Sequence, residues 1–100
     1  MEKRRPTYDL ASIKAEFATV RTLRMTLTAR DSAFALGFTL QEVVEVIQSI
    51  AAVHFYKSMT SLANSRIWQD VYHVPSESVV LYVKFTIDDE GKLVIAFKEK

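Results

Sequence analysis

The hydrophobic period of this chain changes once, from about 3.6 residues before Val53 to about two residues after it. The first period is typical of helices with one apolar face, and the second is typical of strands with one buried face. Helices followed by strands, without alternation, favour an α+β fold over parallel βαβ units. We therefore expect N-terminal helices packed on a C-terminal antiparallel β-sheet meander, in a single domain over residues 1–100.

The helix that follows Thr39 has the clearest signals. Thr39 and Glu42 have the spacing of a capping box, and Phe38 and Val43 have that of a hydrophobic staple. Gly37 supplies a residue that tolerates positive φ after the preceding helix. We expect helices over Tyr8–Phe17, Thr28–Leu36 and Leu40–Ala51, whereas Val20–Leu27 fits either a strand or a helix.

Four runs rich in β-branched and aromatic residues follow, separated by short segments with turn residues. If Gly91 takes the left-handed position of a three-residue loop, Ile87 pairs with Leu93 in the last hairpin. Counting back then places Tyr82 opposite Lys98, on the face away from the aliphatic layer. The expected strands are Phe55–Thr60, Ile67–Val74, Val79–Ile87 and Leu93–Lys98.

The same counting in the preceding hairpin requires a choice of turn centre. A turn centred on Ala63 places Lys57 opposite Gln69, and Phe55 opposite Val71. We expect this second pair of polar side chains to share the face that carries Tyr82.

Charge and composition exclude several classes of protein. The net charge is only +1, but residues 1–30 carry seven basic and three acidic side chains, so the N-terminal part is the cationic one. Basic residues in Met1–Pro6 precede no apolar run, so we expect no secretory signal. With no cysteine, disulfides and thiol chemistry are absent, and the expected compartment is the cytoplasm.

Familiar catalytic and metal-binding motifs are missing. Two glycines do not make a phosphate-binding loop, and two histidines without cysteine do not make a structural zinc site. The acidic run Asp88–Glu90 before Gly91 is typical of a solvated hairpin turn. We therefore expect no metal and no cofactor. What remains is a set of polar and aromatic strand residues, which fits either a solvated sheet face or a surface that binds RNA or phosphate.

Several runs resemble the MqsR family of toxin ribonucleases, which share the RelE-like fold. The resemblance spans the whole chain. It is carried by Met1-Glu2-Lys3-Arg4, Phe55-Tyr56-Lys57-Ser58-Met59-Thr60, Ile67-Trp68-Gln69-Asp70-Val71-Tyr72, Tyr82 with Lys84, and the terminal Phe97-Lys98-Glu99-Lys100.

The resemblance implies the toxin of a type II toxin–antitoxin system, a ribosome-independent endoribonuclease that cleaves mRNA at GCU-type sites. It also implies an MqsA-type zinc-binding antitoxin as partner, and DNA contact only through that antitoxin. By the same resemblance the catalytic residues are Lys57, Gln69 and Tyr82, with Lys98 at a further basic position. This chain departs from the family pattern at His73, where Arg is frequent, and in a longer segment between Val20 and Leu40.

Metal-free RNA cleavage uses the 2′-hydroxyl of the substrate, so the protein must move protons and stabilise charge on phosphorus. Lys57 and Lys98 suit the charge, and Lys98 beside Tyr82 is expected to lower the phenol pKa. Gln69 would position the ribose or phosphate, and Tyr56 or Trp68 would stack a base. His73 fits either proton transfer or simple RNA contact. A non-catalytic module that binds RNA or protein on the same scaffold is the alternative function.

Overall fold

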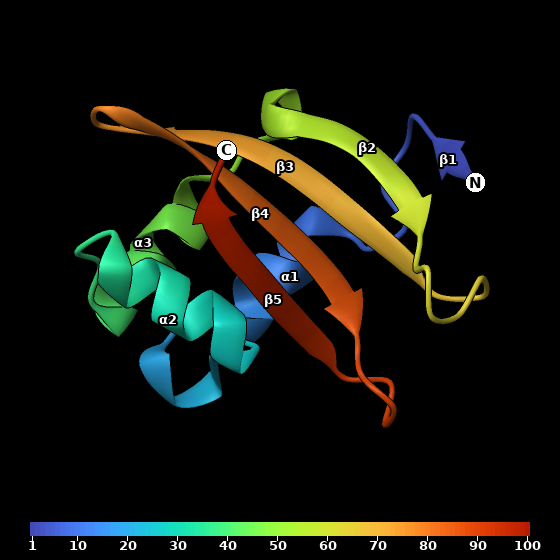
Figure 1. Cartoon of the computed structure of the whole chain (residues 1–100), viewed down its shortest axis with the longest axis horizontal. Coiled ribbons are helices and arrows are strands. Elements are labelled where there is room, and N and C mark those ends of the chain that lie inside the picture. Colours follow the sequence, from blue (N-terminus) through green and yellow to red (C-terminus); the bar gives the residue numbers. More distant parts are fainter.

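A computed structural model describes all residues 1–100 as a five-stranded antiparallel sheet with three α-helices. The strands follow one another across the sheet in the order β1-β2-β3-β4-β5, and the helices cover one face and the β5 edge (Figure 1). The longest α-helix has 10 residues, so none of the helices could span a lipid bilayer. The elements are β1 (Glu2–Lys3), α1 (Leu10–Glu16), η1 (Val20–Thr22), α2 (Leu27–Ala35), α3 (Leu40–Ser49), η2 (Ala52–His54), β2 (Phe55–Thr60), β3 (Trp68–Ser76), β4 (Val79–Ile87) and β5 (Leu93–Glu99).

The α+β class and the meander are confirmed, and the helix ends follow their capping residues. Asp9, Thr26 and Thr39 each accept a hydrogen bond from a backbone N–H in the first turn of the helix that they precede. The capping box of Thr39 with Glu42 is present. Because these caps satisfy otherwise free donors, they determine where each helix begins.

The segment Val20–Leu27, which fitted either a strand or a helix, is neither an α-helix nor a regular strand over most of its length. Its first residues form the 3₁₀ helix η1, and Met25 then makes a single parallel bridge to Ile95 of β5. The backbone N–H of Ile95 donates to the Arg24 carbonyl, and that of Thr26 donates to the Ile95 carbonyl. This short pairing satisfies part of the outer edge of β5 and starts α2 next to that strand.

One apolar core lies between the helices and the sheet. It contains 15 buried residues, contributed by α1, α2, α3 and the inward-facing positions of β3, β4 and β5. Strand alternation produces this arrangement, since Val83 and Phe85 are fully buried while Tyr82 and Lys84, which alternate with them, point the other way. We call the face of β2–β5 that points away from this core the outer face.

The expected pairing of the last hairpin is confirmed, whereas that of β2 with β3 is wrong. Tyr82 pairs with Lys98 as expected. Lys57, however, lies opposite Val71, and Gln69 lies opposite Met59. Phe55 pairs with Tyr72 instead of Val71.

Two local features cause this difference. Thr60 pairs with Trp68, so the turn is centred on Asn64, whose side-chain oxygen accepts a hydrogen bond from the Arg66 N–H at 2.9 Å. The register also shifts between Phe55 and Lys57, where a β-bulge inserts Tyr56.

A buried carboxylate connects the N-terminal segment to the sheet. Asp70 is fully buried and accepts hydrogen bonds from the Thr7 N–H at 2.8 and 3.0 Å, from the Tyr8 N–H at 2.8 Å and from the Ser58 hydroxyl at 2.6 Å. A buried charge requires this number of donors to replace its lost hydration. Asp70 therefore holds residues 7–8 against β2 and β3.

Replacing this carboxylate should destabilise the fold. In Asp70→Asn the amide NH₂ faces N–H donors, so at least one buried donor loses its acceptor, and we expect the free energy of unfolding to fall by about 3 kcal/mol. Urea denaturation followed by circular dichroism measures this change. Asp89→Asn, at an exposed turn position, is the matched control and should change stability by less than about 0.5 kcal/mol. Equal stability of Asp70→Asn and the parent would contradict the anchoring role.

Candidate active site

The outer face carries a continuous row of aromatic and basic side chains across four strands. The Tyr56 ring stacks on the His73 imidazole with ring centroids 4.3 Å apart, and His73 lies 6.0 Å from the Tyr82 ring. The Lys98 ammonium lies 5.0 Å from the Tyr82 ring centroid. Such contacts stabilise cross-strand neighbours and leave one side of the row free.

The β-bulge in β2 places two consecutive side chains on this face. Tyr56 meets His73, which pairs with Tyr82, while the next residue, Lys57, pairs with Val71, which in turn pairs with Lys84. In a regular strand, neighbouring residues point to opposite faces. The bulge thus brings an aromatic ring and an ammonium group together, with the Lys57 Nζ 5.4 Å from the Tyr56 ring centroid.

Lys57 is held by a side chain from β1. Its Nζ donates a hydrogen bond to the Glu2 Oε2 at 2.7 Å, and the same atoms form an ion pair. Glu2 reaches this position because β1 pairs with β2, with Glu2 opposite Met59. The hydrogen bond from Lys57 to Glu2 raises the pKa of Lys57 and lowers that of Glu2. Lys57 is therefore fully charged at neutral pH.

Tyr82 differs from the expectation in its acidity. Burial raises the pKa of the Tyr82 phenol above its ordinary value, and the charge that opposes this shift is that of Lys57. The Lys98 ammonium lies 5.0 Å from the ring centroid, and the pKa is raised in spite of it. The expectation of a lowered pKa is therefore wrong, and Tyr82 carries its proton at neutral pH.

His73 and Lys84 both have lowered pKa values on this face. Burial is the main cause for each side chain, and the nearby charge of Lys100 adds to it for His73 and that of Lys98 for Lys84. At neutral pH His73 is therefore a neutral imidazole, which accepts a proton more readily than any amide or phenol around it.

Gln69 and Trp68 lie on opposite sides of β3. Gln69 is a diagonal neighbour of Lys57, because Lys57 pairs with Val71 two residues along the strand, and diagonal neighbours lie about 7–8 Å apart. Trp68 shares the face of Asp70, where the Lys3 ammonium lies 4.1 Å from its ring centroid. The structure therefore separates Trp68 from the row formed by Tyr56, His73 and Tyr82.

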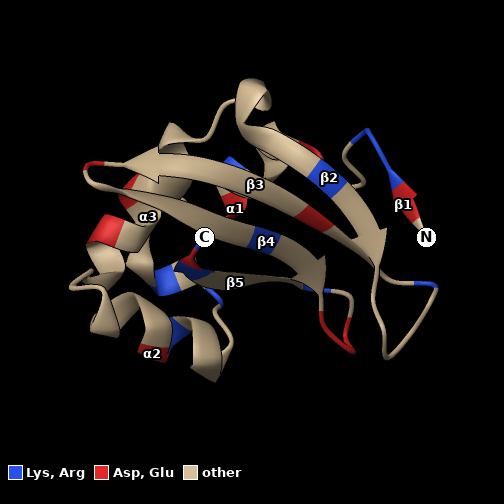
Figure 2. Ribbon diagram, turned by 45° about the horizontal axis from the view of Figure 1, so that its top comes forward, with Lys and Arg blue, Asp and Glu red and all other residues tan.

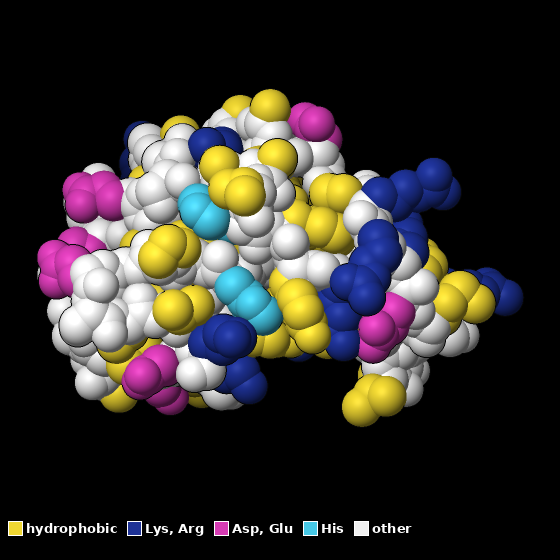
Figure 3. Space-filling view, turned by 90° about the horizontal axis from the view of Figure 1, so that it is seen from above, with side chains coloured by type: hydrophobic (Ala, Val, Ile, Leu, Met, Phe, Trp, Pro, Cys, Tyr) yellow, Lys and Arg dark blue, Asp and Glu magenta, His cyan; other side chains and the backbone are white.

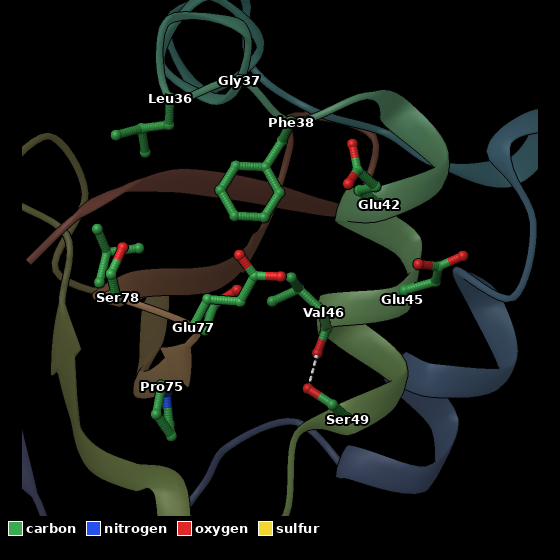
Figure 4. A pocket seen from close by; sticks show the side chains of 12 residues that line it. Leu36, Gly37, Phe38, Glu42, Glu45, Val46, Ser49, Pro75, Glu77 and Ser78 are labelled. Atoms are coloured by element: carbon green, nitrogen blue, oxygen red, sulfur yellow. Dashed lines mark hydrogen bonds between the residues drawn. The ribbon is translucent and has the colours of Figure 1, made fainter.

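The charges on the molecular surface are unevenly distributed. Lys and Arg positions occur on β2, on β4 and at the end of β5 (Figure 2), and in space-filling view cationic side chains gather along one end of this surface with a smaller group at its lower border (Figure 3). A hollow of about 380 Å³ between α3 and the β3–β4 turn is instead acidic, with Glu42, Glu45 and Glu77 in its lining (Figure 4). That hollow repels anions, whereas the outer face attracts them.

The outer face can bind an anion and move protons. It combines a charged amine at Lys57, a protonated phenol at Tyr82 and a neutral imidazole at His73. No group of three or more His, Asp or Glu side chains is placed to hold a metal ion. Sequence analysis did not single out Glu2, because a two-residue strand carries no periodic signal.

Two comparisons with known proteins show what the whole chain is similar to. The family model described as "Motility quorum-sensing regulator, toxin of MqsA" matches residues 5–99. The protein named "mRNA interferase toxin MqsR" from Escherichia coli (strain K12) is 36% identical over 102 residues, covering 100% of each chain.

Removing the carboxylate of Glu2 should lower the pKa of Lys57. Glu2→Gln keeps the shape of the side chain but loses the charge, so the Lys57 ammonium loses the hydrogen bond that favours its protonated form. An NMR titration of the lysine side chains measures the shift. Glu90→Gln, in the exposed β4–β5 turn, is the matched control and should leave Lys57 unchanged. An identical Lys57 titration in the parent and in Glu2→Gln would contradict the ion pair.

Proposed function

The chain belongs to the MqsR toxin family, as its sequence motifs indicated, and from this premise we propose that it is an endoribonuclease that cleaves single-stranded mRNA on the outer face. The proposed substrate sites are of the GCU type, and cleavage needs neither a ribosome nor a metal ion. As the toxin of a toxin–antitoxin system, the protein would inhibit translation and arrest growth until its antitoxin binds.

One observation carries the proposal. Lys57, a charged amine, and Tyr82, a protonated phenol, belong to one cluster on the outer face: the Lys57 Nζ lies 5.4 Å from the Tyr56 ring, and Tyr56 stacks on His73, which pairs with Tyr82. The Lys57 charge also opposes the rise in the pKa of Tyr82. A phosphodiester between them would meet a cation and a proton donor together. These are two of the requirements for cleavage by the substrate's own 2′-hydroxyl, which attacks phosphorus and displaces the 5′-oxygen.

The proposed roles follow from the protonation states. Lys57 stabilises the negative charge that develops on the phosphorane oxygens. Tyr82 donates its proton to the departing 5′-oxygen, so the products are a 2′,3′-cyclic phosphate and a 5′-hydroxyl. Gln69, diagonal to Lys57, positions the ribose or the phosphate through its amide.

Tyr56 and Lys98 lie at the two ends of the aromatic row and are proposed RNA contacts. Tyr56 is 45% exposed, which leaves area for an unpaired base to stack on its ring. Lys98 is exposed at the end of β5, where its charge can approach the backbone of the strand.

The partner of the toxin is proposed to be an MqsA-type antitoxin that carries a zinc-binding domain. The family description, which names this chain's relatives as toxins of MqsA, supports that proposal. The zinc belongs to the antitoxin, so nothing in the chemistry above depends on it.

Cleavage by the purified protein tests the proposed function. In EDTA, with a single-stranded RNA that contains GCU, we expect cut products with 5′-hydroxyl ends. Lys57→Ala and Tyr82→Phe should each lower kcat/KM by about 100-fold or more. Gel mapping of the ends with a labelled RNA measures both the site and the rate.

Matched controls separate chemistry from folding. Lys92→Ala removes an exposed amine from the β4–β5 turn, and Tyr72→Phe removes a hydroxyl from the core side of the sheet, so both should cleave like the parent. RNA that is bound but stays intact would favour the non-catalytic binding module. Cleavage that requires an added divalent cation would contradict the proposed metal independence.

His73 is the proposed acceptor of the 2′-hydroxyl proton. The groups around its ring are the Tyr56 and Tyr82 phenols, and the charge that acts on it is that of Lys100. Because burial lowers its pKa, the imidazole loses its proton at a lower pH than an ordinary histidine does. The cleavage rate should therefore rise with pH and level off at a lower pH than it would with an ordinary histidine.

His73→Asn should lose this rise and cleave about 100-fold more slowly at neutral pH. The pH profile of kcat/KM for the two proteins measures the effect. A profile of His73→Asn that matches the parent's would assign His73 to RNA contact and remove it from proton transfer.

A further inference from the structure

A hollow of about 310 Å³ lies where α2 meets the outer face of β4 and β5. Two cationic side chains border it from the sheet, Lys84 on β4 and Lys98 on β5. From α2 it is bordered by Thr28 and Ser32, which are four residues apart and therefore share one helix face. Tyr82 also lines it, so the hollow adjoins the proposed cleavage site.

Four polar side chains around this hollow have no ion-pair or hydrogen-bond partner within the protein, and the Lys98 ammonium contacts only the Tyr82 ring. Lys84 and Lys98 form no ion pair and no hydrogen bond, and the same is true of the side-chain hydroxyls of Thr28 and Ser32. The contrast with Lys57, which is paired with Glu2, is clear. Polar groups that share a hollow and lack partners are suited to an external ligand that supplies acceptors.

We infer that this hollow is a second phosphate subsite, in which Lys84, with Lys98, Thr28 and Ser32, binds a phosphodiester next to the one that is cleaved. The inference rests on the proposed function, since the ligand is the backbone of the same RNA strand. Lys84 has no role in the cleavage chemistry proposed above. It would instead hold the strand in place across β4 and β5.

Charge and hydrogen-bonding capacity favour a phosphodiester over other ligands. The two ammonium groups can only donate hydrogen bonds and the two hydroxyls can also donate, which suits an acceptor-rich anion, whereas a base edge presents donors as well as acceptors. Lys84 is half-buried, so its charge is poorly hydrated and an anion would restore the interactions lost with water. Lys57 and Lys84 both pair with Val71, from the two strands on either side of it, so the two lysines lie two strand spacings apart, or about 10 Å between backbones.

The test combines a protein variant with an RNA variant. The RNA contains one GCU site with a 2′-deoxy residue at the cleaved position, so that binding is measured without cleavage. In a set of such RNAs, a single phosphate on either side is replaced by an uncharged methylphosphonate. For the parent protein, one of these replacements should weaken binding about tenfold, as measured by fluorescence anisotropy.

Lys84→Met retains the apolar stem and removes the charge. This variant should bind the unmodified RNA about tenfold more weakly than the parent does. For the one methylphosphonate RNA that the parent binds weakly, the variant and the parent should have equal affinity. The slope of log affinity against log salt should fall by about 0.7, the value for one phosphate contact on a single strand. Lys92→Met, in the β4–β5 turn, is the matched control and should behave like the parent.

A second variant tests the same subsite in case Lys84→Met does not fold. Thr28 is exposed, so Thr28→Glu should fold, as thermal unfolding checks, and its carboxylate should repel the phosphate and weaken binding about tenfold. Ala35→Glu adds the same charge two turns further along α2, outside the hollow, and should bind nearly like the parent.

The outcomes separate the subsite from the proposed function. If the parent cleaves RNA and both Lys84→Met and Thr28→Glu bind RNA as tightly as the parent, the proposed subsite is overturned and the proposed nuclease activity is not. Equal loss of affinity for every methylphosphonate RNA in Lys84→Met would also overturn it, because that result indicates general attraction. Parent protein that neither binds nor cleaves RNA would overturn both.

Discussion

The carboxylate of Asp70 is the interaction on which the position of the candidate site depends. Its buried oxygens accept hydrogen bonds from the backbone of Thr7 and Tyr8 and from the Ser58 hydroxyl, so the N-terminal segment is held against β2 and β3. Residues before Thr7 then return along β2 and form β1, which brings Glu2 to Lys57. A group on the inner face of the sheet thus determines the orientation of an amine on the outer face. Loss of that anchor would be expected to release Lys57 as well as to reduce stability.

The elements that sequence analysis predicted correctly are those set by local chemistry. Thr39 and Glu42 form the expected capping box, and Gly91, with φ of 78°, makes the turn that aligns Tyr82 with Lys98. In that turn the Asp88 carboxylate accepts hydrogen bonds from the Glu90 and Lys92 N–H groups, so the turn depends on residues within the same short run. Such features can be read from neighbouring residues alone.

The features that were missed depend on contacts between distant parts of the chain. The bulge at Tyr56 shifts the β2–β3 pairing, and no residue in β2 is of a type that would predict a bulge from the sequence. The strand β1 exists because β2 offers an edge and Asp70 holds the segment that follows, neither of which is visible in a two-residue stretch. The pKa of Tyr82 was misjudged for a related reason. Register places Lys98 beside the phenol, but the direction of its approach and the burial of the ring require the three-dimensional structure.

The three lysines of the outer face are not equivalent, and this difference suggests how a polyanion would engage it. Lys57 is already paired with Glu2, so a phosphate that approaches it must compete with a carboxylate. Lys84 has no partner, and burial and Lys98 lower its pKa, so an approaching anion would stabilise its charged form. A phosphate at Lys57 must therefore compete with the Glu2 carboxylate, whereas a phosphate at Lys84 displaces no partner of that lysine.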